Sequence, residues 1–243
     1  MNRICYFGFY NTEYSRNRIL IKGLKENGLE VIECNDRSPF LKKYWRLFLK
    51  QLAIRNKYDV MIVGFPGYIS VIFARFLTSK PIILDAYTSL YNSNVIDRKY
   101  YKPYSSQAIY NWVLDWLSCR IANAILLDTN AHIDYFVKTF GVSKNKFKRI
   151  FVGAEIIDIK RDDRKKFTVH FHGSFIPLQG VEYIVKAAKL LEKVSIQFNI
   201  IGQGQTFKEV KALVDKLKIS NINFIPPVSF QDLSVFINNS DIC

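Results

Sequence analysis

Several features that would assign this chain to a particular class are scarce or missing. Its four cysteines are scattered and form no CxxC motif, which indicates reduced thiols and argues against a disulfide scaffold. No run of eighteen apolar residues occurs, so the sequence predicts no membrane-spanning helix. The opening residues do not have the pattern of a signal peptide, and we therefore expect a cytoplasmic protein.

Histidine is also scarce, with three residues in the chain. His170 and His172 are two apart on a predicted strand and so share one face. No cysteine or carboxylate follows at the spacing of a third and fourth metal ligand, and the sequence predicts neither a metal site nor another cofactor. We expect His172, beside Gly173, to contact either a donor or an acceptor substrate, and His170 to be structural.

Acidic residues are few, 21 against 35 basic residues, which leaves a net charge of +14. Such an excess favours anionic partners. The segment Phe40–Lys57 interleaves basic and aromatic residues, as a helix lying on an anionic membrane does, although an ordinary domain helix with a solvated charged face has the same pattern. The residues expected at a membrane are Lys42, Lys43, Trp45, Arg46, Phe48 and Lys50.

The clearest motif is a strand–helix–strand unit over Phe167–Gly204. Phe167–His172 alternates apolar and polar residues, Val181–Leu191 has apolar residues at helical spacing, and Ile196–Ile201 is a second strand. Glycines follow both strands, and the carboxyl ends of strands are where open α/β sheets bind nucleotides.

The order and spacing of these elements resemble the nucleotide-sugar-binding domain of GT-B glycosyltransferases, specifically glycosyltransferase family 4. The family typically shows Gly-Arg-Leu, then Lys-Gly, a long helix, and a strand that ends in Gly-x-Gly. These positions read Gly173-Ser174-Phe175, Gln179-Gly180 and Gly202-Gln203-Gly204 here. The resemblance implies that the backbone amides of Gly173, Gly202 and Gly204 stabilise the diphosphate of a nucleotide diphosphate-sugar, that no metal is needed, and that transfer retains the anomeric configuration.

Two departures from the family pattern weaken the expected donor site. Ser174 and Gln179 replace the Arg and Lys that typically contact the pyrophosphate, which removes charge-assisted hydrogen bonds. The paired glutamates of the family would lie beyond Cys243, so we expect a truncated donor domain and a weak or inactive enzyme in this form.

The first part of the chain alternates strands and helices, as a parallel α/β domain does. We expect an N-terminal, acceptor-side Rossmann-like domain over residues 1–153, a charged linker over 154–166, and a partial nucleotide-sugar-binding domain over 167–243. Together these predict an α/β, GT-B protein with two Rossmann-like domains facing a cleft, the second incomplete.

Candidate acceptor-side residues lie at predicted strand ends. Arg16 and Arg18 open a helix after the first strand, with Ser15 as its expected N-cap, and could attract phosphate or be surface charges. Asp85 closes the fourth strand, near the position of a family histidine, and could orient or deprotonate an acceptor hydroxyl or pin a loop. The loop that follows carries Tyr87, Tyr91 and Arg98, which could bind a sugar and a pyrophosphate or pack as a lid.

Two other classes fit parts of the pattern. A dinucleotide-binding dehydrogenase would need GxGxxG, and the third glycine is missing after Gly204. A nucleic-acid binder would use the positive charge, but no helix-turn-helix, zinc-finger or RNP-type motif occurs.

We therefore expect a glycosyltransferase that moves a sugar from a nucleotide diphosphate-sugar to a glycan or lipid-linked acceptor, in surface polysaccharide synthesis, on the inner membrane face and without nucleic acid. A non-catalytic remnant, or one subunit of a split transferase whose partner completes the donor site, remains open.

Overall fold

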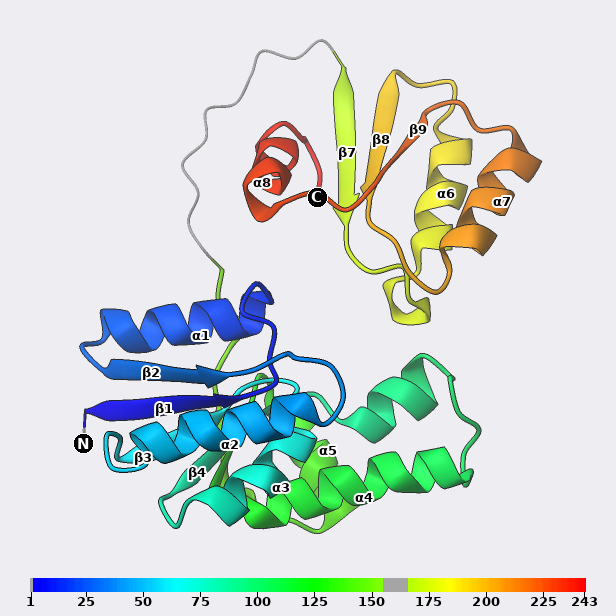
Figure 1. Ribbon diagram of the computed structural model, residues 1–243. Helices are drawn as coiled ribbons and strands as arrows, with labels where there is room; N and C mark the ends of the chain where they lie inside the picture. The colour runs from blue at the N-terminus through cyan, green and yellow to red at the C-terminus, as the bar shows by residue number, and fades with distance from the viewer. Residues whose placement is uncertain (1, 155–165) are drawn as a thin grey trace. The chain divides into compact units, whose positions relative to one another are not determined.

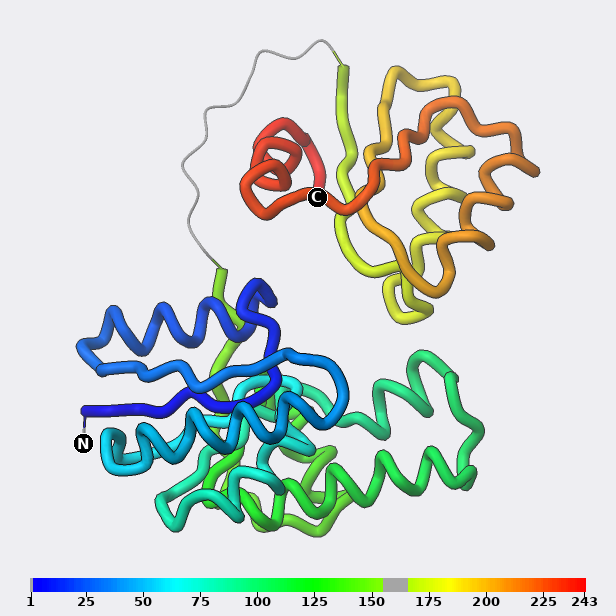
Figure 2. Tube along the Cα trace, viewed as in Figure 1, coloured from blue at the N-terminus to red at the C-terminus, as the bar shows by residue number. Residues whose placement is uncertain are grey.

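A computed structural model describes residues 2–154 and 166–243 and divides the chain into two compact units. Unit 1 spans Met1–Glu155 and unit 2 spans Ile156–Cys243 (Figures 1 and 2). The predicted linker, 154–166, lies almost entirely outside the described residues.

Unit 1 is built on a six-stranded parallel sheet in the order β2-β1-β3-β4-β5-β6. Its strands are β1 (Arg3–Gly8), β2 (Glu30–Asn35), β3 (Val60–Val63), β4 (Ile82–Tyr87), β5 (Ala124–Leu127) and β6 (Phe147–Arg149). Its helices are α1 (Ser15–Glu26), α2 (Lys42–Ile54), α3 (Tyr68–Leu77), the π-helical segment η1 (Asn92–Asp97), α4 (Ser106–Ile121), α5 (Asn130–Phe140) and the 3-10 turn η2 (Lys144–Lys146).

Two apolar clusters cover the two faces of this sheet. Helices α2 to α5 pack on one face around Phe7, Leu47 and Phe136, and α1 packs on the other around Tyr6 and Ile21 (Figure 1). This arrangement follows from right-handed crossovers, because the connection from β1 to β2 runs one way along the sheet and the later ones run the other way. The order reverses between β1 and β3, and ligands of such sheets bind at the carboxyl ends of the strands there.

Unit 2 holds a three-stranded parallel sheet in the order β7-β8-β9. Its elements are β7 (Phe167–His172), the 3-10 turn η3 (Pro177–Gln179), α6 (Val181–Leu190), β8 (Ile196–Ile201), α7 (Phe207–Leu217), β9 (Ile222–Ile225) and α8 (Phe230–Asn238). Helices α6 and α7 pack on one face, and α8 lies on the other (Figure 1). Ile242 bridges β7 in parallel on the side away from β8, so strand order also reverses at β7.

The predicted elements are present, with differences at their ends. Tyr14, not Ser15, is the N-cap of α1, and no side chain caps this helix. Strand β4 continues through Asp85 to Tyr87, so Asp85 lies inside the strand and does not close it. Apolar periodicity locates an element, but its last residues depend on hydrogen bonds that the pattern does not contain.

Candidate functional site

Two of the predicted site residues meet at the carboxyl end of the sheet in unit 1. Asp85 of β4 and Arg16 of α1 form a buried ion pair, in which Arg16 Nη2 lies 2.9 Å from Asp85 Oδ1 and Nε lies 3.1 Å from Oδ2. Arg16 Nη1 also donates to the carbonyl oxygen of Ile150, at 3.0 Å. Arg16 therefore ties α1, β4 and the segment after β6 together.

This pairing changes the expected role of Asp85. Its side chain is fully buried and both carboxylate oxygens accept from Arg16, so in this conformation it has no access to an acceptor hydroxyl. Burial raises the pKa of Asp85 above its ordinary value, and the Arg16 guanidinium opposes that rise. Asp85 is thus placed to hold Arg16 and not to act as a base. The sequence analysis treated the two residues separately because they are 69 positions apart.

Aromatic side chains surround this ion pair. The guanidinium carbon of Arg16 lies 5.4 Å from the ring centre of Tyr87, and Phe65 meets Tyr87 edge-on with ring centres 5.2 Å apart. Tyr14 lies against Phe65 at 5.5 Å. Tyr87 has φ +57°. This backbone conformation is uncommon for a residue with a large side chain, and residues that adopt it are concentrated at functional sites. Sequence analysis named only Tyr87 of these rings, although the Gly-Phe-Pro-Gly turn after β3 marked the position of Phe65.

The predicted tyrosine loop is anchored from α4. Asp115 is fully buried and accepts hydrogen bonds from the Ser89 hydroxyl, at 2.7 Å, and from the backbone amides of Leu90 and Tyr91, at 3.0 and 2.9 Å. Tyr91 and Arg98 are half-buried at the two ends of η1. Asp115 was not among the predicted residues, and its signal was a carboxylate between Trp112 and Trp116 in a stretch of α4 that is otherwise apolar.

Arg18 does not join Arg16. Positions two residues apart on a helix differ by about 200° around its axis, so the side chains of Arg16 and Arg18 point to different sides of α1. Arg18 donates to the Glu13 carbonyl oxygen at 3.3 Å and lines a surface recess with Lys22 and Glu33. Its predicted contact with an acceptor remains a prediction.

A histidine–carboxylate contact lies at the end of the neighbouring strand. Asp128 follows β5, and its Oδ1 is 2.5 Å from Nδ1 of His132, one turn along α5. Thr129 caps α5 by accepting a hydrogen bond from the His132 amide at 3.1 Å. The spacing of four residues was the signal for this pair, because Asp128 lies one residue before the N-cap Thr129 and its side chain reaches the first turn of α5.

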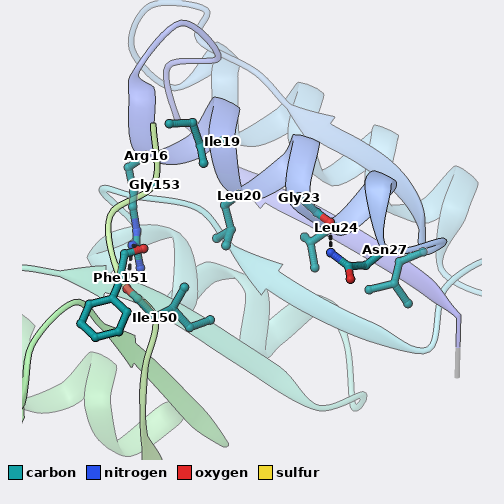
Figure 3. A pocket seen from close by; sticks show the side chains of 10 residues that line it. Arg16, Ile19, Leu20, Gly23, Leu24, Asn27, Ile150, Phe151 and Gly153 are labelled. Carbon is teal, nitrogen blue, oxygen red and sulfur yellow. Dashed lines mark hydrogen bonds between the residues drawn. The ribbon is translucent and has the colours of Figure 1, made fainter. Parts of the chain in front are cut away.

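An apolar pocket of about 400 Å³ runs along α1 from Arg16 (Figure 3). Ile19, Leu20 and Leu24 line it from the helix, and Ile150 and Phe151 line it from the segment after β6. Apart from Arg16, this pocket contains none of the residues predicted for binding.

In unit 2 the predicted donor-side glycines form two interlocked turns. Phe175 donates its amide to the Gln203 carbonyl, and Thr206 donates to the Phe175 carbonyl, both at 3.0 Å. A Cβ atom on Gly202 would lie 1.9 Å from the Gly173 carbonyl oxygen, and one on Gly204 would lie 2.6 Å from the Phe175 carbonyl oxygen. Both glycines also have positive φ, +141° and +152°. The contact between the turns therefore requires residues without side chains.

This geometry corrects the expected use of the glycine amides. Gly173 donates its amide to Ile201 O at 3.0 Å, and Gly202 donates to Ile225 O at 3.1 Å. These two N–H groups continue the strand pairing and are not available to a diphosphate. Ser174 and Gln179, which stand where the family has cations, are exposed beside the turns.

His170 and His172 lie together on β7, as predicted from their spacing. His172 is exposed, whereas His170 is buried and stacks on Phe236 of α8. Among residues 2–154 and 166–243, no three His, Cys, Asp or Glu side chains are grouped as metal ligands would be.

Helix α2 exposes an apolar stripe beside basic residues. Leu41, Trp45 and Leu52 are 80%, 62% and 45% exposed, and their spacing places them on one helical face. Phe48 stacks on Trp45, with ring centres 5.6 Å apart. On the flank, Arg46 Nε and Lys50 Nζ lie 3.3 and 3.0 Å from Asp36 Oδ2, Lys43 Nζ lies 4.8 Å from the Phe9 ring centre, and Lys42 is exposed.

No helix within the described part of the chain has the length and apolar character needed to cross a membrane.

Comparison with known proteins places these features in context. Residues 153–243 match the family described as "Glycosyl transferases group 1". An uncharacterized glycosyltransferase of Methanocaldococcus jannaschii, MJ1178, is 30% identical over 66 residues, which are 27% of this chain and 18% of that protein. The chain thus spans less than a fifth of the length of this curated relative.

Solved structures resemble almost the whole chain. The Anabaena protein Alr3699/HepE, in complex with UDP and glucose, has a TM-score of 0.64 at 12% identity, covering 99% of this chain and 73% of that one. The lipopolysaccharide outer core galactosyltransferase WaaB has a TM-score of 0.53 at 13% identity, covering 98% and 72%. Staphylococcus aureus MnaA, solved with UDP, has a TM-score of 0.57 at 16% identity, covering 99% and 72%. The predicted α/β, GT-B fold is confirmed.

Proposed function

We propose that this chain is a glycosyltransferase of family 4 that moves a sugar from a nucleotide diphosphate-sugar to a glycan or lipid-linked acceptor in surface polysaccharide synthesis. The observation that carries the proposal is the pair of interlocked glycine turns at the carboxyl end of the unit 2 sheet, within the segment that matches the glycosyltransferase family. Retention of configuration and independence of metal follow from the resemblance.

On the donor side, the glycine turns offer backbone that is not covered by side chains. Because Gly202 and Gly204 carry no side chain, the backbone of the second turn can approach the first, and a diphosphate can approach both. Gly173, Ser174 and Gln179 border the same turns, and Ser174 and Gln179 offer the diphosphate neutral hydrogen-bonding groups.

On the acceptor side, unit 1 supplies Arg16 with its aromatic surroundings and the anchored loop. Asp85 contributes by fixing the Arg16 guanidinium, while Tyr87 and Tyr91 offer ring faces and hydroxyls to a sugar. Arg98 and Arg18 offer positive charge to a pyrophosphate-linked acceptor.

A gain of affinity tests the donor site. Ser174→Arg and Gln179→Lys restore the cations typical of the family, and we expect each to tighten UDP binding by about threefold to tenfold, because charge-assisted hydrogen bonds are about twice as strong as neutral ones. UDP is the probe because similar proteins were solved with it. Isothermal titration calorimetry on residues 1–243 measures the change.

The matched control is Ser195→Arg, which adds the same charge at an exposed position before β8, at the opposite end of that strand. Equal tightening by this control would reduce the effect to general electrostatics. Absence of UDP binding in all three variants and in the parent would overturn the donor assignment.

Because both cations are missing, we expect the parent chain to bind UDP but to transfer sugar weakly or not at all. A split transferase would gain activity when its partner subunit is added.

We further propose that α2 holds the protein on the anionic inner face of the plasma membrane. The apolar stripe at Leu41, Trp45 and Leu52 would enter the headgroup region, with Lys42, Lys43, Arg46, Lys50 and Phe48 beside it. We expect Trp45→Ser to reduce sedimentation with phosphatidylserine vesicles severalfold. Tyr183→Ser, which removes an equally exposed aromatic residue from unit 2, should leave sedimentation unchanged. Equal loss in both variants would contradict the assignment of α2.

A further inference from the structure

The two histidines of β7 are joined by a hydrogen bond between their rings. His170 Nε2 lies 3.1 Å from His172 Nδ1, and the ring centres are 5.1 Å apart with the planes inclined by 27°. Phe236 of α8 stacks on His170 at 6.2 Å, with an interplanar angle of 12°. Strand and helix together therefore fix the orientation of the His170 ring.

Burial decides which nitrogen of His170 carries the hydrogen. The residue is 2% exposed, and its Nδ1 atom has no hydrogen-bond partner among the described residues. A hydrogen on Nδ1 would be a buried donor without an acceptor, which is unfavourable. A hydrogen on Nε2 is instead donated to His172. Burial, with a smaller contribution from His172, lowers the pKa of His170 to about 4, so the ring is neutral at pH 7.

The tautomer of His172 follows from that of His170. Its Nδ1 accepts the hydrogen bond, so the single hydrogen of the neutral ring must lie on Nε2. Burial lowers the pKa of His172 as well, which favours the neutral form. His172 ends the strand at which the order of unit 2 reverses, with β8 on one side and Ile242 on the other. Ligands of open α/β sheets bind at the carboxyl end of such a strand.

We propose that His170 is a positioning residue that holds His172 in the Nε2–H tautomer, so that His172 presents one fixed, neutral donor to a phosphate oxygen of the nucleotide-sugar. The inference rests on the proposed donor-binding role of unit 2. It gives the site a directed N–H group where Ser174 and Gln179 have replaced the family's cations.

Nitrogen-15 NMR of the imidazoles tests the tautomers without an activity assay. The chain has three histidines, and His132→Asn removes one set of signals, which simplifies assignment of the other two. We expect both His170 and His172 to be protonated on Nε2 at pH 7, with a scalar coupling across the N–H···N bond. His170→Phe, which keeps the ring stacked on Phe236, should mix the tautomers of His172. A parent protein in which His170 is protonated on Nδ1, or in which His172 already populates both tautomers, would overturn the inference even if the variant does not fold.

UDP titration tests the donor itself. We expect UDP to shift the His172 Nε2 signal, His172→Phe to weaken UDP binding about tenfold, and His172→Gln, which keeps an N–H at a similar position, to restore affinity to within about threefold of the parent. If UDP shifts the amide signals of Gly202 and Gly204 but not His172, the inference fails and the proposed function stands. If UDP shifts none of them, the donor-binding proposal fails, and the ligand of His172 with it.

Discussion

Arg16 forms more hydrogen bonds within unit 1 than a phosphate-binding residue or a surface charge would need. Its guanidinium reaches the Asp85 carboxylate on β4 and the backbone oxygens of Ile150 and Phe151 after β6. Pairs of this kind contribute little net stability over apolar residues, but removal of one partner strands a buried charge. We therefore expect removal of either Arg16 or Asp85 alone to destabilise the fold around the site.

Arg16→Met should lower the free energy of unfolding of unit 1 by about 3–5 kcal/mol at pH 8, because Asp85 is left as an unpaired buried carboxylate. The loss should be smaller at pH 5 than at pH 8, because burial raises the pKa of Asp85 and the neutral form of an unpaired carboxyl becomes more favourable as pH falls. All three tryptophans lie in unit 1, so tryptophan fluorescence in urea follows its unfolding alone. Asp85→Leu combined with Arg16→Met should recover most of the loss. A loss under 1 kcal/mol for Arg16→Met at pH 8 would show that the pair is not needed.

Gly202 offers a second test at the scale of one residue. In Gly202→Ala the new Cβ meets the Gly173 carbonyl oxygen at 1.9 Å, and φ +141° is unfavourable for alanine, so we expect unit 2 to lose about 3 kcal/mol or more. Gly173→Ala is the matched control, because the atoms nearest to its Cβ belong to the Phe171 ring, at 3.3 Å or more, and the substitution should cost about 1 kcal/mol. Amide hydrogen exchange along β8 measures both. Similar protection in the two variants would mean that the turns separate without cost.

At the scale of elements, the tyrosine loop depends on a carboxylate of α4. Asp115 accepts hydrogen bonds from one hydroxyl and two backbone amides at the start of the loop, so helix α4 sets the position of Tyr91. Burial raises the pKa of Asp115 to about 6, and its three hydrogen bonds oppose the rise. The anchor therefore titrates close to neutral pH.

Replacement of Asp115 by Asn should change how stability depends on pH. The folded protein holds the Asp115 proton up to about pH 6, whereas the unfolded chain releases it near pH 4, so the stability from this proton is complete below pH 4 and is lost as pH rises through 6. The free energy of unfolding of the parent, minus that of Asp115→Asn, should be larger at pH 4.5 than at pH 7.5 by on the order of 2 kcal/mol. Urea unfolding followed by tryptophan fluorescence at the two pH values checks this. A difference independent of pH would place the pKa of Asp115 at its ordinary value.

For the whole molecule, the net charge of +14 is unevenly divided. Most of the excess lies in unit 1, which also carries the basic flank of α2, while unit 2 holds the glycine turns. General attraction for polyanions and recognition of a nucleotide should therefore differ in their response to salt.

Non-specific binding to duplex DNA should weaken by at least tenfold between 50 and 200 mM NaCl, because it rests on counterion release. UDP affinity should change by less than about threefold over the same range, because neutral groups form most of the proposed site. Fluorescence anisotropy with labelled DNA and calorimetry with UDP give the two slopes. DNA binding that persists at 200 mM NaCl with sequence preference would favour the nucleic-acid alternative.

Local pattern was sufficient for the elements and for the type of fold. The alternation of Phe167–His172 and the apolar spacing of Val181–Leu191 predicted β7 and α6, because strand and helix periodicities are properties of neighbouring residues. The glycines after β7 and β8 were identified for the same reason, and the GT-B resemblance they carried is confirmed for the fold.

Local patterns of residues were therefore enough to predict the order of strands and helices, the parallel sheets and the positions of the glycine turns. Which polar groups the fold itself engages became visible in the three-dimensional arrangement of the chain. It paired Asp85 with Arg16, engaged the amides of Gly173 and Gly202 in strand pairing, and placed Asp115 under the loop. The physical reason is that hydrogen bonds and ion pairs between residues distant in the chain depend on burial and direction, and periodicity contains neither.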